Sequence, residues 1–484
     1  MDGAGVDLKH NGEDNHQGGQ IMADTAALAY AHNAHDRFLD ELKELLRIPS
    51  ISTLPEHRPD MERAAGWLRD RLNAIGIQAE VIPGDGYPLV YGEWLKAPGA
   101  PTILVYGHYD VQPVDPIDLW TSPPFDPIVR DGNIYARGAA DDKGQTMTLI
   151  DAAESLLHAE GSLPVNLKFL IEGQEEAGGA VVTAYVREHG DRLRADVALV
   201  ADTGMFAPGI PTLDTGLRGN VYTEVFARGA AQDLHSGLYG GVAPNPLNAL
   251  AHIIAGLKDT EGRITIPGFY DDVRLPGEEI RASWHDLPFD EDRFRREEIG
   301  ASALVGEPGF TSVERMWSRP TLDVHGIAGG FVGAGAKTVI PSVASAKISM
   351  RIVPDQRAEG IFDLFRRRVE QLTPPGIGIN VVLHHGGEPV LVPIDSPYMR
   401  AAQQALAEIF DHPAVLARSG GSIPIVGLFK EALGLDSVLM GWGLPDDNLH
   451  APNEKLSLTN FYAGIDAVIR FWQLLGTARE TLPR

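Results

Sequence analysis

Apolar residues recur along this chain at two different spacings, and the change from one to the other divides it into regions. Residues 35–50 and 61–76 carry apolar side chains three and four positions apart, which places them on one face of an α-helix. Gly76 stands where the second helix is expected to end, because glycine readily takes the left-handed conformation that closes a helix. Two amphipathic helices are therefore predicted before the first strand.

Short apolar runs with the composition of buried strands then alternate with helical segments. A helix is predicted at 143–161, a second near 180–190 and a third at 396–410. The predicted strands cover residues 102–106, 133–140, 166–172, 196–202 and 436–441. This alternation predicts an α/β fold with a doubly wound, mainly parallel sheet.

The middle of the chain follows a different pattern. Residues 220–229 and 342–354 alternate between apolar and polar side chains, as half-buried antiparallel strands do, and a helix is predicted at 247–257 between them. Residues 262–320 are rich in loop-forming residues. We therefore predict an inserted α+β domain. The expected division is 215–388 for the inserted domain, with 23–214 and 389–484 forming the other domain.

Composition limits the partners and the chemistry. A length of 484 residues favours two domains, and a formal charge of -25 disfavours nucleic acid or an anionic membrane surface as a partner. The chain has no cysteine, so any bound metal must be held by histidine and carboxylate side chains. No apolar stretch reaches the roughly 20 residues that a membrane span needs.

The N-terminal residues 1–22 are polar and rich in glycine, and we expect them to form a disordered extension. They lack the apolar core of a secretory signal peptide. Together with the absence of cysteine, this favours a cytoplasmic location.

Side chains that can bind metals follow the predicted strands. In open α/β sheets, ligands bind beyond the carboxyl ends of the strands. Any one of these residues alone would more often be structural, since adjacent acids commonly begin helices. Occurring together at successive strand ends, two histidines and several carboxylates favour a site for two metal ions, with one carboxylate left to act as a general base. The residues are His108, Asp110, Asp141, Glu175, Glu176, Asp202 and His450.

Eight short motifs, in this order, resemble those of the M20 metallopeptidase family, and most closely its carnosinase-type dipeptidases. The resemblance extends from about residue 36 to the C-terminus. The motifs are GHYDVQP, ARGAADDKG, EGQEEAGG, DLHSGLYGG, HGIAGGF, GAKTVIP, GGSIP and HAPNEK.

The resemblance implies a role for each residue at the strand ends. Asp110 would orient the imidazole of His108, and Glu175 would be the general base. A cis peptide between Asp141 and Asp142 is also expected. Two divalent ions are implied, with zinc favoured and manganese or cobalt as alternatives. The implied metal ligands are His108, Asp141, Glu176, Asp202 and His450, with Asp141 bridging the two ions.

The resemblance also implies that the inserted domain acts as a lid and a dimerisation domain. His235 would reach the active site of a partner subunit and stabilise an oxyanion, which implies a homodimer. Arg351 would hold the terminal carboxylate of the substrate, a task suited to a guanidinium group. Thr338, Gly421 and Ser422 would line the same pocket.

The implied function is metal-dependent hydrolysis of dipeptides or short peptides that have a free C-terminal carboxylate. An amidase of the same family, acting on N-acyl or N-carbamoyl amino acids, is the alternative, and Asp202 in place of glutamate favours the dipeptidase. A catalytically inactive binding scaffold is a third hypothesis. It predicts a lost ligand or a lost base, and here all five ligands and Glu175 are present.

Overall fold

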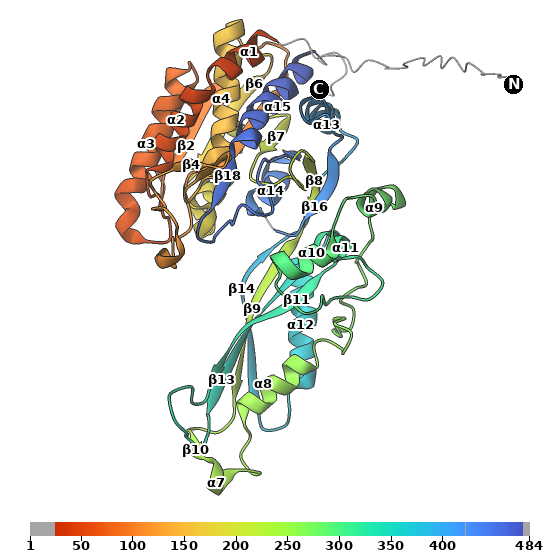
Figure 1. Cartoon of the computed structure of the whole chain (residues 1–484). Coiled ribbons are helices and arrows are strands. Elements are labelled where there is room, and N and C mark those ends of the chain that lie inside the picture. Colours follow the sequence, from red (N-terminus) through yellow and green to blue (C-terminus); the bar gives the residue numbers. More distant parts are fainter. Residues whose placement is uncertain (1–24, 422, 478–484) are drawn as a thin grey trace, which may run out of the picture.

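The computed structural model describes residues 25–421 and 423–477, which form two lobes with separate hydrophobic cores (Figure 1). The predicted extension at 1–22 and the predicted pocket residue Ser422 lie outside the described residues. The chain enters the second lobe between β8 (Thr212–Leu217) and β9 (Gly219–Arg228). It returns between β14 (Gly378–Gly387) and β15 (Val390–Leu391).

A six-stranded, mainly parallel sheet forms the centre of the first lobe, which confirms the predicted fold class of that lobe. Only β2 runs against the other five strands. In spatial order the strands are β1 (Gln78–Ile82), β2 (Leu89–Trp94), β6 (Asn166–Glu172), β3 (Thr102–His108), β7 (Val197–Val200) and β17 (Ser437–Leu439).

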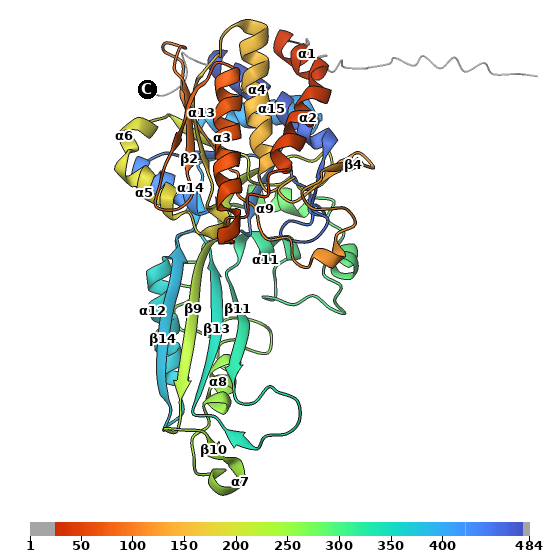
Figure 2. The ribbon, with the colours of Figure 1, turned by 90° about the vertical axis from the view of Figure 1, so that its left-hand side faces the viewer.

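Helices cover both faces of this sheet (Figure 2). Gly107 of β3 lies against Thr146 of α4, whereas the preceding Tyr106 points to the other face and packs edge-on against Phe429. Gly76 takes a positive φ of 90° just beyond α3, as predicted. The helices are α1 (Ala26–Asn33), α2 (His35–Leu46), α3 (Arg58–Ala74), α4 (Lys143–Glu160), α5 (Ala180–Glu188), α6 (Gly190–Leu193), α13 (Pro397–Phe410), α14 (Pro424–Leu428) and α15 (Leu458–Thr477).

Two small sheets complete the first lobe. β8 pairs with β15 and with β16 (Val415–Ser419), and β5 (Asn133–Tyr135) pairs with β4 (Ile128–Arg130) and β18 (Lys455–Ser457). The strand predicted at 133–140 is therefore wrong beyond Tyr135, and it does not belong to the central sheet. Residues 136–142 form a loop before α4, in which the N–H groups of Gly138, Ala140 and Asp141 bond to the side chain of Glu454 and not to a strand.

The second lobe is a four-stranded antiparallel sheet in the order β11 (Thr321–Gly329), β13 (Val343–Ile352), β9 and β14. Helices α8 (Pro246–Ala255) and α12 (Ala358–Leu372) pack on the sheet and share its apolar core. Strands β9 and β13 correspond to the predicted alternating segments. The region 262–320 contains the short helices α9 (Glu278–His285), α10 (Glu291–Arg293) and α11 (Ser312–Ser318) as well as loops.

The far end of the second lobe is a small tip, remote from the first lobe in both views (Figures 1 and 2). It contains β10 (Leu234–His235), its antiparallel partner β12 (Val339–Ile340) and the single-turn helix α7 (Ser236–Tyr239). Among the described helices of both lobes, none is long and apolar enough to cross a membrane.

Candidate metal centre

The carboxyl edge of the central sheet gathers the metal-binding side chains predicted from the sequence. His108 is the last residue of β3, and Asp202 lies two residues after β7. Glu175 and Glu176 begin a 3₁₀ turn, η3 (Glu175–Ala177), shortly after β6, and His450 lies in the loop that follows β17. Asp141 reaches the same place from the loop before α4, and not from a strand end.

These side chains form two groups that share Asp141. The ligand atoms of His108, Asp141 and Asp202 all lie within 4.8 Å of one another, as do those of Asp141, Glu176 and His450. His108 Nε2 is 3.1 Å from Asp141 Oδ1, and His450 Nε2 is 2.9 Å from Asp141 Oδ2. Each oxygen of Asp141 thus faces a different imidazole, which is the arrangement that a bridging carboxylate needs.

A third group of acids in the described chain already forms ion pairs with an arginine. Glu41, Asp151 and Glu154 lie close together in the helical layer. Arg71 Nη2 lies 2.8 Å from Glu41 Oε2 and 3.0 Å from Asp151 Oδ1, and it also contacts Glu154. A guanidinium group therefore balances these carboxylates, and the group is a buried ion-pair network.

Asp110 connects the imidazole of His108 to the turn that carries the two glutamates. Its backbone oxygen lies 3.1 Å from His108 Nδ1, and its carboxylate lies 3.4 Å from the same atom. The carboxylate also accepts hydrogen bonds from Ser52 Oγ (2.6 Å) and from the N–H groups of Glu175 (3.2 Å) and Glu176 (3.1 Å). With Nδ1 directed at Asp110, Nε2 of His108 is left to face the centre.

The peptide bond between Asp141 and Asp142 is cis, as the sequence resemblance led us to expect. Asp142 points away from the centre and accepts hydrogen bonds from the N–H of His108 (3.1 Å) and from Thr146 Oγ1 (2.7 Å). Asp142 therefore ties the end of β3 to the first turn of α4, while Asp141 faces the two imidazoles.

Burial governs the protonation of Glu175. It raises the pKa of Glu175 to about 7, and the neighbouring Glu176 and Asp141 carboxylates add to the rise against the opposing effect of His108. Burial likewise raises the pKa of Asp202 well above its usual range. Both shifts reflect negative charge that is crowded into a site with little water, where added positive charge would be favourable.

The histidines carry the compensating charge. The hydrogen bond to Asp141 and the nearby carboxylate of Glu176 raise the pKa of His450 to about 10. Burial disfavours a charged His108, but its hydrogen bonds to Asp110 and Asp141 outweigh burial and raise its pKa. Protons on these imidazoles occupy the positions from which neutral histidines bind a metal.

The donor set fits two divalent cations. Nitrogen and carboxylate oxygen are ligands that zinc, manganese and cobalt accept, and a shared carboxylate suits a pair of ions. The buried Oε1 atom of Glu176 has no hydrogen-bond partner, although it faces the centre 3.3 Å from His450 Nε2. A cation bound between these groups would satisfy that oxygen.

The predicted substrate residues do not all meet at this centre. His235 and Thr338 are exposed at the tip of the second lobe, where the carbonyl of Thr338 accepts a hydrogen bond from the N–H of Ser236 (3.0 Å). Arg351 lies half-buried on β13, paired with Asn220 of β9 at the end of the sheet nearer the first lobe (Figure 1).

Gly421 lies in the loop after β16, and its N–H donates a hydrogen bond to Ser419 Oγ (3.2 Å). This loop begins close to where the two lobes join, because β16 pairs with β8, the last strand before the second lobe. Gly421 therefore lies near the junction of the two lobes, unlike the two residues at the tip.

Three supporting residues were missed by the sequence analysis. Ser52 anchors Asp110, Gln112 Nε2 donates to Glu176 Oε2 (2.7 Å), and Glu454 binds the backbone of the loop that ends in Asp141. Gln112 and Glu454 stand inside motifs that carry the family resemblance, and this was the only signal for them. Ser52 had none, since it lies 58 residues from its partner.

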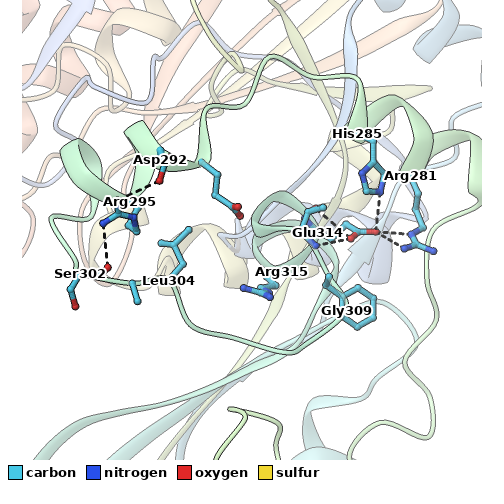
Figure 3. A pocket seen from close by; sticks show the side chains of 13 residues that line it. Arg281, His285, Asp292, Arg295, Ser302, Leu304, Gly309, Glu314 and Arg315 are labelled. Atoms are coloured by element: carbon cyan, nitrogen blue, oxygen red, sulfur yellow. Dashed lines mark hydrogen bonds and ion pairs between the residues drawn. The ribbon is translucent and has the colours of Figure 1, made fainter.

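A separate cavity of about 700 Å³ lies between α9, α10 and α11 in the second lobe (Figure 3). Its charged side chains pair with one another. Arg281 lies 2.6 Å from Glu314, and Arg295 contacts Asp292 (3.3 Å) and the carbonyl oxygen of Ser302 (3.2 Å). We therefore place the chemistry at the carboxyl edge of the central sheet.

Known proteins resemble this chain in both sequence and fold. A family model described as peptidase family M20/M25/M40 matches residues 104–474. The chain is 32% identical over 459 residues to the human protein named Beta-Ala-His dipeptidase, covering 90% of each. It is 31% identical over 468 residues to the Cys-Gly metallodipeptidase of Candida albicans, covering 91% of this chain and 95% of that relative.

Among solved structures, a metallo-carboxypeptidase of the M20 family from Sulfolobus solfataricus has a similar fold. The TM-score is 0.82 at 32% identity, and the match covers 91% of this chain and 100% of that one.

Proposed function

The chain belongs to peptidase family M20, and on that basis we propose that it hydrolyses the peptide bond of dipeptides or short peptides with a free C-terminal carboxylate, using two divalent metal ions. The observation that carries the proposal is the pair of ligand groups that share Asp141, with the half-buried Glu175 beside them. Two named relatives at similar identity are dipeptidases, which favours this reaction over the amidase alternative.

We assign His108, Asp141 and Asp202 to one metal position, and Asp141, Glu176 and His450 to the other. Zinc is the favoured ion, with manganese or cobalt as alternatives, because the donors are nitrogen and carboxylate oxygen without sulfur. When bound, such ions lower the pKa of a water molecule between them and polarise the scissile carbonyl.

Glu175 is the proposed general base. It takes a proton from the attacking water and later gives that proton to the leaving amine. Its raised pKa suits both steps, because a base with a pKa near 7 can accept and release a proton at neutral pH. Asp110 holds the N–H of Glu175 and the imidazole of His108, so it keeps the base and a ligand in a fixed relation.

The substrate is proposed to lie between the two lobes. Arg351, on the sheet of the second lobe, binds the terminal carboxylate through its planar guanidinium group. Thr338, Gly421 and Ser422 are the proposed lining of the same pocket. The second lobe therefore acts as a lid, and closing it brings Arg351 toward the metal centre.

We infer that the protein is a homodimer in which His235 serves the active site of the partner subunit. Within one chain the tip that carries His235 lies at the far end of the second lobe from the metal centre (Figures 1 and 2). The tip also exposes large apolar side chains, with Leu238 76%, Val242 87% and Val332 94% exposed. Exposed apolar clusters of this kind mark contact surfaces, and a second copy of this chain would cover them.

A carboxypeptidase that accepts longer peptides is the second candidate function. The similarity to the Sulfolobus solfataricus metallo-carboxypeptidase favours it, since that structure matches at 32% identity over nearly the whole chain. The two functions share the bond that is cut and differ in the length of the substrate. A cytoplasmic location remains our proposal for either.

The test is hydrolysis of a small panel by metal-stripped protein refilled with zinc or manganese. The panel holds several dipeptides, a tripeptide, a longer peptide and matching N-acetyl and N-carbamoyl amino acids, with Glu175→Ala as the control. Cleavage of dipeptides by the wild type alone supports the proposal. Preference for the longer peptides indicates the carboxypeptidase, and cleavage of only the acylated compounds contradicts both.

A further inference from the structure

Glu454 lies behind the metal centre, in the same loop as His450, and its side chain is fully buried. Its two carboxylate oxygens accept four hydrogen bonds, two at each oxygen. The donors are the N–H groups of Gly138 (2.9 Å), Ala140 (2.9 Å) and Asp141 (3.1 Å) and Nη1 of Arg137 (2.8 Å).

The segment that donates these hydrogen bonds is not part of a strand. Residues 136–142 form the loop between β5 and α4, and Gly138 within it has a positive φ of 83°. The backbone is buried, so each N–H needs an acceptor, and Glu454 supplies one for three of them. The carboxylate of Glu454 therefore helps to fix the position of Asp141.

One side chain thus joins the loop of Asp141 to the loop of His450, whose Nε2 lies 2.9 Å from Asp141 Oδ2. We propose that Glu454 is a positioning residue that sets these two ligands relative to each other for cation binding. This inference rests on the proposed function, because it assumes that the centre binds two divalent ions.

A chain of hydrogen bonds also links Glu454 to Glu176, the third ligand of the second metal position. Arg137, held by Glu454, donates from Nη2 to the carbonyl oxygen of Pro113 (3.0 Å). The adjacent Gln112 donates to Glu176 Oε2 (2.7 Å). Glu454 is therefore connected to Asp141, His450 and Glu176, which together form the second metal position.

The first metal position is supported by other residues. His108 is oriented by Asp110, which is anchored by Ser52, and His108 receives support from Asp142 at its backbone N–H. Loss of Glu454 should therefore weaken the second position more than the first. A merely structural role for a buried acid predicts no such difference between the two positions.

Glu454→Gln is the test variant. The amide nitrogen that replaces one oxygen cannot accept, so two of the four donors lose their acceptor. The matched control is Glu307→Gln in the second lobe, where Glu307 forms a buried two-bond pair with Arg319 (2.7 and 2.9 Å). Both variants break a buried arginine–carboxylate pair, but only the first one lies beside the metal centre.

The first readout is titration of metal-free protein with Co²⁺, followed by absorption and calorimetry. We expect the wild type and Glu307→Gln to bind two ions alike. In Glu454→Gln one of the two bound ions should lose about 10- to 100-fold in affinity, the usual effect of removing a residue that orients a ligand. The affinity for the other Co²⁺ ion should change less. Unchanged binding in Glu454→Gln, or an equal loss in Glu307→Gln, would overturn the inference.

The second readout needs no metal. Amide hydrogen exchange of metal-free protein should be faster over residues 136–142 in Glu454→Gln than in the wild type, and unchanged there in Glu307→Gln. Unchanged exchange in Glu454→Gln would overturn the inference even if metal binding changed. If the wild type itself bound no Co²⁺, the proposed function would fail, and exchange alone would decide whether Glu454 positions the loop.

Glu454→Asp serves if Glu454→Gln does not fold. It keeps the charge and both oxygens but withdraws them by one methylene group from the backbone donors. The same selective loss at one Co²⁺ equivalent is expected, whereas two equivalents of wild-type affinity would contradict the positioning role.

Discussion

The metal centre and the tip of the second lobe differ in how completely one chain builds them. At the centre, His108 and Asp110 are fully buried. The carboxylate of Asp110 accepts three hydrogen bonds, from the hydroxyl of Ser52 and from the backbone N–H groups of Glu175 and Glu176. At the tip, His235 is exposed, and its Nδ1 accepts a bond only from the nearby N–H of Gly237 (2.9 Å). Both regions carry residues of one proposed active site, but only the first is prearranged within a single chain.

The difference teaches that cation binding and turnover should depend on different parts of the molecule. On the proposed mechanism, binding of the metal ions would require only the first lobe, whose side chains are already gathered. Turnover would require in addition the proposed lid closure and the tip of a second copy. Changes at the centre should therefore affect both properties, and changes in the second lobe should affect turnover alone.

Removal of the metal ions should have the largest effect. Dialysis against a chelator is expected to abolish hydrolysis, because in the proposed mechanism the ions activate the water and polarise the scissile carbonyl. Activity should return when zinc or manganese is added back, as measured by dipeptide cleavage. Full activity after verified removal of the ions would contradict the role of the centre.

Glu175→Gln should come next. Loss of a general base lowers kcat by about 100- to 10,000-fold, while the metal ligands remain in place. Binding of two ions, measured by calorimetry, should stay close to that of the wild type. An active Glu175→Gln protein would show that another group takes the proton from water.

His235→Ala is expected to lower kcat by about 100- to 1,000-fold, the cost of removing one oxyanion donor. Metal binding should not change, because His235 is not among the proposed metal ligands. Steady-state kinetics and a metal titration on the same preparation measure both properties. A change in metal affinity would contradict the separation of the two regions.

Arg351→Lys should have a smaller and different effect. Lysine keeps the charge but loses the two-bond geometry, so KM should rise about 10- to 100-fold with little change in kcat. Dipeptide amides, which lack the terminal carboxylate, serve as the control and should not distinguish the variant from the wild type. An equal effect on the amides would remove Arg351 from carboxylate binding.

The smallest effect concerns stability and pH. The pKa of Glu175 is about 7 in the folded protein against an ordinary 4.5, and that of His450 is about 10 against 6.5. Between pH 5 and 9, taken roughly, the folded metal-free protein binds more protons than the unfolded chain, so its free energy of unfolding falls as pH rises.

Thermal melting across that pH range checks this point. The melting temperature of metal-free protein should drop by roughly 1 °C for each kcal/mol lost, and metal-loaded protein should depend less on pH because cations replace the protons. A melting temperature that rises with pH in the metal-free protein would contradict the assigned shifts.

Much of the fold could be predicted because the central strands are buried on both faces. The run at 166–172 is apolar enough to match β6 in full, and β3 exceeds its prediction only by Gly107 and His108. The edge strands β11 and β14 were not predicted, since each has an exposed face and β14 contains two histidines and terminal glycines. Edge strands need fewer apolar residues, so their pattern is weak.

The candidate site could also be predicted where its side chains follow the central strands, but not where a loop carries them. Four of the metal-binding side chains follow central strands, where the general rule for α/β sheets places ligands. Asp141 was attributed to a strand that does not exist beyond Tyr135. The loop that carries it is held by Glu454, more than 300 residues away in sequence, and contacts between a carboxylate and backbone N–H groups leave no sequence pattern.

The most direct test of the account mixes two inactive variants, Glu175→Gln and His235→Ala, under conditions that allow subunits to exchange. If His235 acts in the partner's active site, each mixed dimer has one site with both residues intact, and an equal mixture should regain about a quarter of wild-type activity. If His235 acts within its own chain, or the protein is a monomer, the mixture should remain as inactive as its components. That result would contradict the claim that one chain completes the metal centre and a second copy completes the active site.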